Sequence, residues 1–245
     1  MIKLTLTIQR QQAQSPATFQ SYALEVTPQI TLLDCLTRIK AEQDGSLAYR
    51  KNCRNAICGS CTLRVNDRPV LACKESIGSL QAWLENNGQT PGNSLTLKPL
   101  GNLPVIRDLV VDMTAFWDDL AAIQPFLLPA QALPEREFSQ SPRERQTLTQ
   151  TANCILCGAC YSDCDAKGKN QNFLGPHALA KVHRYLLDSR DQASQSRLEQ
   201  QNQGKSGVWG CNGCRMCNLS CPMEVAPMTQ IEAIKVRLFD LLDPL

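Results

Sequence analysis

Thirteen cysteines among 245 residues fall at spacings that could bind metal. The first group follows the pattern C-x4-C-x2-C, with a fourth cysteine shortly after it. Plant-type [2Fe–2S] sites have this spacing. Gly59, inside the loop, permits close backbone approach and lets N–H groups point at sulfur. A structural zinc site is the alternative, although zinc more often takes paired C-x2-C knuckles. The predicted [2Fe–2S] ligands are Cys53, Cys58, Cys61 and Cys73.

Two later groups share the spacing C-x2-C-x2-C-x3-C, and the second of them ends in Cys221-Pro222. This is the bacterial ferredoxin run, in which the first three cysteines hold one cubane and the fourth ligates the other cluster. Zinc or disulfides are the alternative, but disulfide pairing of thirteen cysteines would leave one over. The spacing predicts a [4Fe–4S] cluster on Cys154, Cys157, Cys160 and Cys221, and a second [4Fe–4S] cluster on Cys164, Cys211, Cys214 and Cys217.

The remaining cysteine, Cys35, lies in an apolar segment with helical spacing that opens on Thr31 and Asp34, as a capping box would. We interpret it as a small buried thiol. No apolar run reaches the roughly 18 to 20 residues of a membrane helix, and no secretory signal is visible. The expected compartment is a reducing cytosol, where clustered cysteines more often bind metal than form disulfides. The net charge of +2 gives no support for nucleic acid as a partner.

The first hundred residues predict a small mixed sheet with one helix. Ile2, Leu4, Leu6 and Ile8 alternate with polar residues, which indicates a half-buried strand. Asn66-Asp67 is a turn signal between two short strands. With the cluster loop at 50–61, this pattern suggests a β-grasp ferredoxin domain over residues 1–104. The other expected elements are strands at 19–26, 62–65, 70–73 and 95–98 and a helix at 32–43.

Residues 105–245 predict a helical ferredoxin domain with two cubane-type clusters, so the fold class is α+β. Ser141-Pro142 begins a capping box with Pro at N1, and Gly175-Pro176 and Pro227 open two further helices. Another helix is expected near 112–123. The Gln- and Ser-rich stretches 124–141 and 189–206 are expected to be surface connectors. We interpret the two histidines, His177 and His183, as structural or surface residues, because six positions do not place them on one helix face.

These motifs occur in an order that resembles the iron–sulfur subunit of succinate dehydrogenase and fumarate reductase. The resemblance covers nearly the whole chain. It implies an N-terminal [2Fe–2S] β-grasp domain, a C-terminal helical ferredoxin domain and two kinds of partner. One partner is a FAD-containing flavoprotein that oxidises succinate, and the other is a membrane anchor or quinone-reducing subunit. The segments that carry the resemblance are Arg50–Cys61, Leu71–Cys73, Pro104–Met113, Cys154–Cys157, Phe173–Pro176 and Asp188–Asp191.

The chain departs from the family pattern in two places, at the third cluster and at the quinone site. In the usual member the third centre is [3Fe–4S], held by three cysteines that correspond to Cys164, Cys211 and Cys217, and the position of Cys214 is not a cysteine. Here a fourth thiolate is present, so we expect a second [4Fe–4S] cluster, or [3Fe–4S] if Cys214 is not a ligand. The second departure is at the quinone. The family's Pro, Trp and His are replaced by Asp165, Lys167-Gly168-Lys169 and Asn212.

The sequence therefore predicts an electron-transfer subunit of a succinate dehydrogenase of the tricarboxylic acid cycle or of a fumarate reductase. No substrate-binding catalytic site is expected on this chain, because the cofactors carry the redox step. Partner subunits would hold it on the cytoplasmic, inner face of a membrane, and the replaced quinone residues favour an anchor with its own cysteine-rich domains. The alternatives are the iron–sulfur subunit of a thiol:fumarate reductase or glycolate oxidase type of flavin dehydrogenase, and a free-standing ferredoxin-like carrier.

Overall fold

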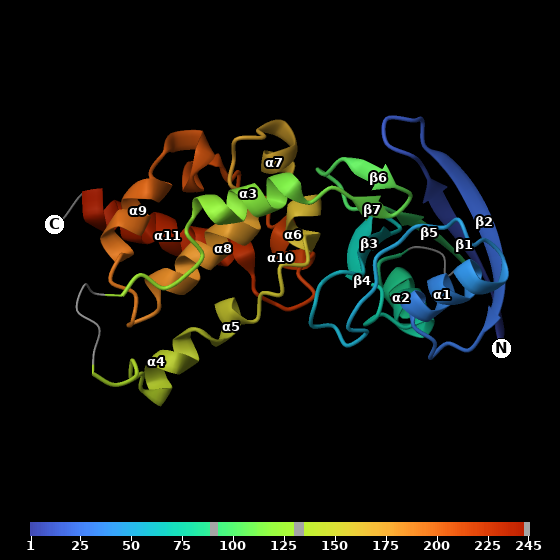
Figure 1. Ribbon diagram of the computed structural model, residues 1–245, viewed down its shortest axis with the longest axis horizontal. Helices are drawn as coiled ribbons and strands as arrows, with labels where there is room; N and C mark the ends of the chain where they lie inside the picture. Colours follow the sequence, from blue (N-terminus) through green and yellow to red (C-terminus); the bar gives the residue numbers. More distant parts are fainter. Residues whose placement is uncertain (89–92, 130–134, 243–245) are drawn as a thin grey trace. The chain divides into compact units, whose positions relative to one another are not determined.

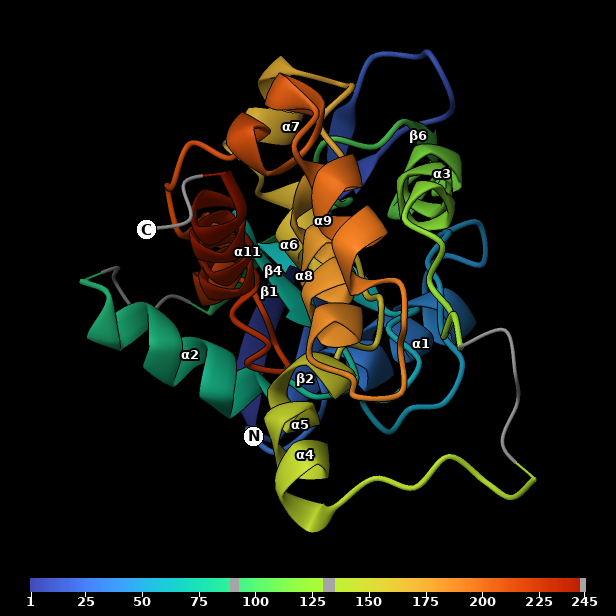
Figure 2. The same cartoon turned by 90° about the vertical axis from the view of Figure 1, so that its left-hand side faces the viewer.

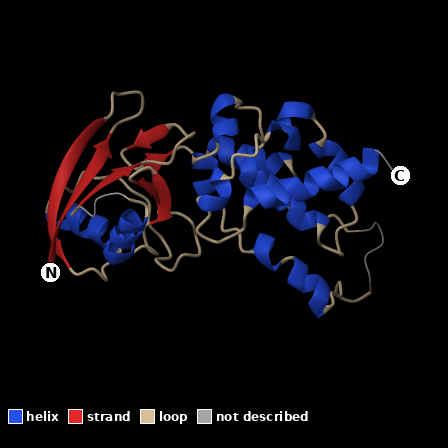
Figure 3. Ribbon diagram, turned by 180° about the vertical axis from the view of Figure 1, so that it is seen from behind, coloured by secondary structure: helices blue, strands red, loops and turns tan. Residues whose placement is uncertain are grey.

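The computed structural model describes residues 1–88, 93–129 and 135–242. The chain divides into two compact units. The first unit contains Met1–Met113 and Ile155–Ser162, and the second contains Thr114–Cys154 and the chain from Asp163 onward. The strands belong to the first unit, and most of the helices belong to the second (Figure 1, Figure 3). A boundary at residue 104 stays a prediction, although here the chain up to Met113 groups with the strands.

The first unit is built on a five-stranded mixed sheet in the order β2-β1-β5-β3-β4. The first two strands form an antiparallel hairpin, and β5 pairs with β1 in parallel. Leu4, Leu6 and Ile8 are buried while their neighbours are not, so the alternation in the sequence gives the core face of β1. The predicted β-grasp arrangement is confirmed. The bounds are β1 (Ile2–Arg10), β2 (Thr18–Val26), β3 (Thr62–Val65), β4 (Arg68–Leu71) and β5 (Ser94–Lys98).

Two helices belong to this sheet, one more than we predicted. Helix α1 (Leu32–Glu42) begins at Thr31, whose side chain accepts from the N–H of Asp34, and it buries Cys35 completely. Burial raises the pKa of the Cys35 thiol to about 11. Helix α2 (Ile77–Asn86) was not predicted, although Ser76 caps it and Ile77, Leu80 and Leu84 form its buried face at helical spacing.

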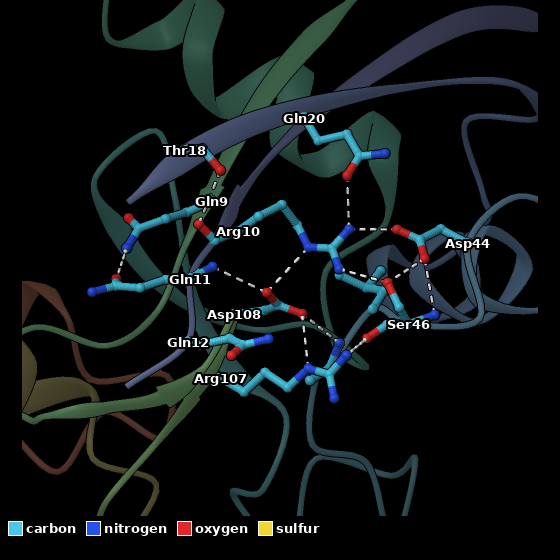
Figure 4. Close-up of polar contacts among 12 residues, drawn as sticks. Gln9, Arg10, Gln11, Gln12, Thr18, Gln20, Asp44, Ser46, Arg107 and Asp108 are labelled. Carbon is cyan, nitrogen blue, oxygen red and sulfur yellow. Dashed lines mark hydrogen bonds and ion pairs between the residues drawn. The ribbon is translucent and has the colours of Figure 1, made fainter. Parts of the chain in front are cut away.

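A short hairpin, β6 (Val105–Arg107) and β7 (Val110–Val111), follows the sheet and was also missed. Between its strands lies buried Asp108. Its carboxylate pairs with Arg10 Nε at 3.1 Å and accepts from the backbone N–H of Ala48 at 2.9 Å (Figure 4). The Arg10 guanidinium also pairs with Asp44. This network therefore joins β1 to the segment that leads into the first cysteine loop.

The second unit is a group of helices around two longer ones. Helix α8 (Gly175–Leu186) packs against α11 (Pro227–Leu242), and α9 (Ser194–Gln201) contacts both (Figure 2). Ser141 and Glu144 form the expected capping box, and Pro lies near the start of α4 and α8. The bounds are α3 (Thr114–Ala122), α4 (Pro142–Thr147), α5 (Thr149–Ala152), α7 (Asp165–Lys169), α8 (Gly175–Leu186), α9 (Ser194–Gln201), α10 (Met216–Leu219) and α11 (Pro227–Leu242), with 3-10 turns η1 (Gly204–Ser206) and η2 (Val208–Gly210); α6 (Ala159–Ser162) belongs to the first unit.

We expected the stretch 189–206 to be a surface connector, and this prediction is wrong. The stretch contains α9, in which Arg197 is buried against Asp191 at 3.0 Å and donates to the carbonyls of Ile123 and Phe126. A charged residue can be buried when every donor is paired, and a composition of Gln and Ser does not reveal that pairing. Of the other expected connector, residues 130–134 lie outside the described part, and 135–139 are exposed.

Among residues 1–88, 93–129 and 135–242, no helix is both long and apolar enough to cross a bilayer.

Candidate metal centres

The structure brings the four cysteines of the first group together. The N–H groups of Asn55 and Cys58 both point at Cys53 Sγ, at 3.3 and 3.4 Å. The N–H of Ala56 points at Cys73 Sγ at 3.3 Å. The N–H of Cys73 in turn reaches Cys61 Sγ at 3.4 Å. The loop therefore supplies several backbone donors to sulfur, which suits a group of thiolates whose negative charge needs compensation.

The loop takes this shape because several of its residues have positive φ. Arg54, Ala56 and Gly59 have φ of 58°, 53° and 68°, and this turns successive N–H groups toward one side. At Gly59 a side chain would not fit. An added Cβ would lie 2.7 Å from Cys157 Cα and 2.9 Å from Cys157 Cβ. The loop thus packs directly on the segment that carries Cys157, within the first unit.

Two thiols of this group have opposite environments. Burial alone would raise the pKa of Cys58, but the Ser60 hydroxyl, 3.1 Å away, and backbone N–H groups lower it to about 6. Burial raises the pKa of Cys61 to about 12. Since the thiolate is the form that ligates metal, Cys58 is ready to bind, whereas Cys61 becomes a thiolate only when a metal replaces its proton.

The members of the second group belong to both units. Cys157 and Cys160 lie in the first unit, and Cys160, a residue of α6, is buried there. Cys154 and Cys221 lie in the second unit. The segment around α6 is fixed within its own unit by the N–H of Gly101, which donates to Ser162 Oγ at 2.8 Å.

Cys221 has its own supporting chain of hydrogen bonds in the second unit. The N–H of Val225 points at Cys221 Sγ at 3.3 Å. The carbonyl of Val225 accepts from Gln230 Nε2 at 3.0 Å, and Gln230 Oε1 lies 2.6 Å from His183 Nδ1. Burial lowers the pKa of His183, so a neutral ring that donates from Nδ1 to the amide oxygen fits this site. Nothing in the sequence indicates the contact with His183, because this residue lies on another helix, far from Gln230 along the chain.

The third group surrounds a cavity in the second unit. Burial raises the pKa of Cys217 to about 12 and that of Cys164 too, and the neighbouring thiols of the group add to both shifts. The N–H of Lys167 points at Cys164 Sγ at 3.4 Å. Cys214, in contrast, is exposed. The cavity is lined by Cys164, Cys211, Cys214 and Cys217, by the apolar side chains of Ala166, Phe173, Pro176, Met228 and Ile231, and by Asn212 and Arg215.

These arrangements fit iron–sulfur clusters. Throughout residues 1–88, 93–129 and 135–242, no three His, Cys, Asp or Glu side chains converge closely enough to hold one metal ion. A cluster spreads four thiolates over two or four irons, so each iron takes one or two of them. Backbone donors to sulfur in the first group and an apolar wall around the third are the features that such an anionic, water-sensitive group requires.

Comparison with known proteins places both cysteine-rich regions in described families. Residues 5–118 match a 2Fe-2S iron-sulfur cluster binding domain, and residues 150–225 match a 4Fe-4S dicluster domain. The fumarate reductase iron-sulfur subunit of Haemophilus influenzae is 37% identical over 228 residues, which cover 88% of this chain and 84% of that protein. The mitochondrial succinate dehydrogenase [ubiquinone] iron-sulfur subunit 3 of Arabidopsis thaliana is 35% identical over 206 residues, which cover 83% of this chain and 63% of that protein.

A solved structure gives the same result for the fold. A chain of the Mycobacterium smegmatis Sdh1 complex in the apo form superimposes with a TM-score of 0.84 and 24% identity, covering 99% of this chain and 98% of that one. The expected α+β architecture, a [2Fe–2S] domain followed by a helical dicluster domain, is thereby confirmed.

Proposed function

Since the chain belongs to the iron–sulfur subunits of succinate dehydrogenases and fumarate reductases, and is an electron-transfer subunit of such a complex, we propose how its residues perform the relay. Cys53, Cys58, Cys61 and Cys73 hold a [2Fe–2S] centre. A [4Fe–4S] centre is held by Cys154, Cys157, Cys160 and Cys221, and the third centre by Cys164, Cys211, Cys214 and Cys217. The support is the set of N–H groups aimed at sulfur in the first group and the cavity around the third.

When bound, the clusters supply one-electron transfer, and the chain's own residues set the conditions for it. Backbone N–H groups of Asn55, Ala56 and Cys58 favour the more negative, reduced state by donating to sulfur. Phe173, Met228 and the other apolar side chains of the cavity shield the buried side of the third centre from water. No acid–base or nucleophilic role is assigned to this chain, because the substrate chemistry belongs to a flavoprotein partner.

For the third centre we propose [4Fe–4S]. The support is that Cys214 lines the same cavity as the other three thiols of its group, so a ligand is available for a fourth iron. An oxidised [4Fe–4S] cubane is diamagnetic, whereas an oxidised [3Fe–4S] centre carries an unpaired spin. EPR of the mildly oxidised, anaerobically prepared complex should show no [3Fe–4S] signal. A full-intensity signal in undamaged protein would refute this assignment.

The proposed partners are a FAD-containing flavoprotein and a membrane anchor or quinone-reducing subunit, through which the chain lies on the inner, cytoplasmic face of a membrane. The surroundings of the third cavity favour an anchor with its own cysteine-rich domains over a quinone pocket on this chain. Asn212, which lines the cavity, is exposed and donates to Asp165 Oδ2 at 2.9 Å, and Lys169 pairs with Asp165 at 2.8 Å. Such a polar, charged rim does not suit an apolar quinone.

Purification of the native complex under gentle detergent conditions tests these partners. We expect a brown complex that contains FAD and reduces an artificial acceptor with succinate, or oxidises a reduced dye with fumarate. A stable brown chain of 27.1 kDa without flavin would contradict the proposed partnership. A haem-bearing two-subunit anchor in the complex would contradict the cysteine-rich type.

A further inference from the structure

Lys167 is buried, which is unusual for a lysine. Its side chain is 1% exposed, and its ammonium reaches Asp119 Oδ2 at 2.6 Å. The same nitrogen donates to the carbonyls of Gln171 and Phe173, each at 2.8 Å. An ammonium has three donors, and these three acceptors use all of them. The side chain is therefore held in one place, since release of any acceptor would leave a buried donor unpaired.

The backbone of Lys167 reaches the third centre. It lies in α7, which follows directly on Cys164, and its N–H points at Cys164 Sγ at 3.4 Å. The segment that its ammonium holds also contributes to the cavity, because Phe173 lines it together with Cys164. Through its side chain Lys167 thus connects α3, at Asp119, with the Phe173 end of the segment, and through its backbone N–H it reaches Cys164 at the other end.

We propose that Lys167 is a positioning residue for the third centre: its buried ammonium holds the backbone N–H that donates to Cys164 Sγ and thereby raises the reduction potential of the cluster. The inference rests on the proposed ligand role of Cys164. Reduction adds one electron to the centre, supplied by the flavoprotein, and no bond at Lys167 forms or breaks. The added negative charge strengthens the N–H···S bond, so a well-held donor favours the reduced state.

Lys167 and Lys169 each have a carboxylate that balances the charge, Asp119 for Lys167 and Asp165 for Lys169. The two lysines differ in burial. Lys169, on the same short helix, provides the comparison. Its side chain is 74% exposed and pairs with Asp165, so its charge is largely compensated and solvated. The two lysines therefore separate a general effect of charge on α7 from the effect of the buried side chain.

The test is a redox titration of the third centre, followed by EPR, in the complete complex with its flavoprotein. For Lys167→Met we expect the ratio of reduced to oxidised centre to fall about tenfold at a given ambient potential, about 59 mV for a one-electron couple. Lys167→Arg, which keeps the cation, should retain most of the wild-type potential. Lys169→Met should change the ratio less than twofold. The [2Fe–2S] centre in the same samples should keep its potential.

Lys167→Gln covers the case in which Lys167→Met does not assemble, because an amide can still donate to the carbonyls of Gln171 and Phe173. It should give a smaller fall of the same sign. An unchanged potential in Lys167→Met, or in Lys167→Gln, with a normal third centre overturns this inference alone. Equal shifts in Lys167→Met and Lys169→Met also overturn it. A wild-type complex without any third centre overturns the proposed ligand set, and this inference with it.

Discussion

Substitution of Gly59 by alanine should destabilise the first cysteine loop by an amount that the structure allows us to divide into two parts. The first part is backbone strain. At φ +68° an L-residue is disfavoured by about 1–2 kcal/mol. The second part is the clash of the new Cβ with Cys157 Cα and Cβ, at 2.7 and 2.9 Å. Cys157 Cα is a backbone atom and its Cβ is fixed to it, so neither can rotate away, and overpacking of this kind costs roughly 1–3 kcal/mol.

Together these terms predict that Gly59→Ala lowers the free energy of unfolding by roughly 2–5 kcal/mol. Gly88 is a matched control. It has φ +70°, but a Cβ there would meet nothing within 4 Å, so Gly88→Ala should show only the backbone term. Thermal unfolding of both variants, followed by circular dichroism and by loss of the visible cluster absorption, gives the comparison. Equal stability losses in the two variants would refute the packing of the loop on Cys157.

Three further predictions follow from the hydrogen bonds and burial described above. Ser60→Ala removes the hydroxyl 3.1 Å from Cys58 Sγ, so the [2Fe–2S] potential should fall by about 59 mV, a tenfold change, in a redox titration, and an unchanged potential would count against that contact. Burial lowers the pKa of His177 to about 3, against 6.5 in the unfolded chain. The free energy of unfolding should therefore fall as the pH drops below 6.5, by about 2 kcal/mol at pH 5. In urea titrations, His177→Gln should flatten this pH dependence. Asp108→Asn removes one of the two carboxylates that pair with Arg10 and should cost about 2 kcal/mol in the same titrations, whereas a loss below about 1 kcal/mol would show that the network contributes little.

The cofactor groups could be predicted from the sequence because cluster ligation depends on short spacings within one segment. The loop from Cys53 to Cys61 and the repeated run that ends in Cys221 are of this kind. Strand β1 and the helices that start after Thr31 and Ser141 were likewise found, since alternation and caps are local signals.

What the sequence did not reveal depends on contacts between distant residues. From the sequence, Lys167 is identified only among the residues that replace the family's quinone-site residues. In the structure Lys167 is buried, because Asp119 lies beside it in space. Gln230, which supports the backbone that donates to Cys221 Sγ, pairs with His183 from another helix, and nothing in its own segment indicates this pairing. Helix α2 is a different case. Its cap at Ser76 and its apolar face at helical spacing are local signals, so this helix was within reach of prediction from the sequence.

The most direct test of the account is the iron and acid-labile sulfide content of the anaerobically purified native complex. One [2Fe–2S] and two [4Fe–4S] centres predict about ten irons and about ten sulfides per copy of this chain. Material that contains zinc in place of iron and no acid-labile sulfide would contradict the claim that these twelve cysteines hold three clusters.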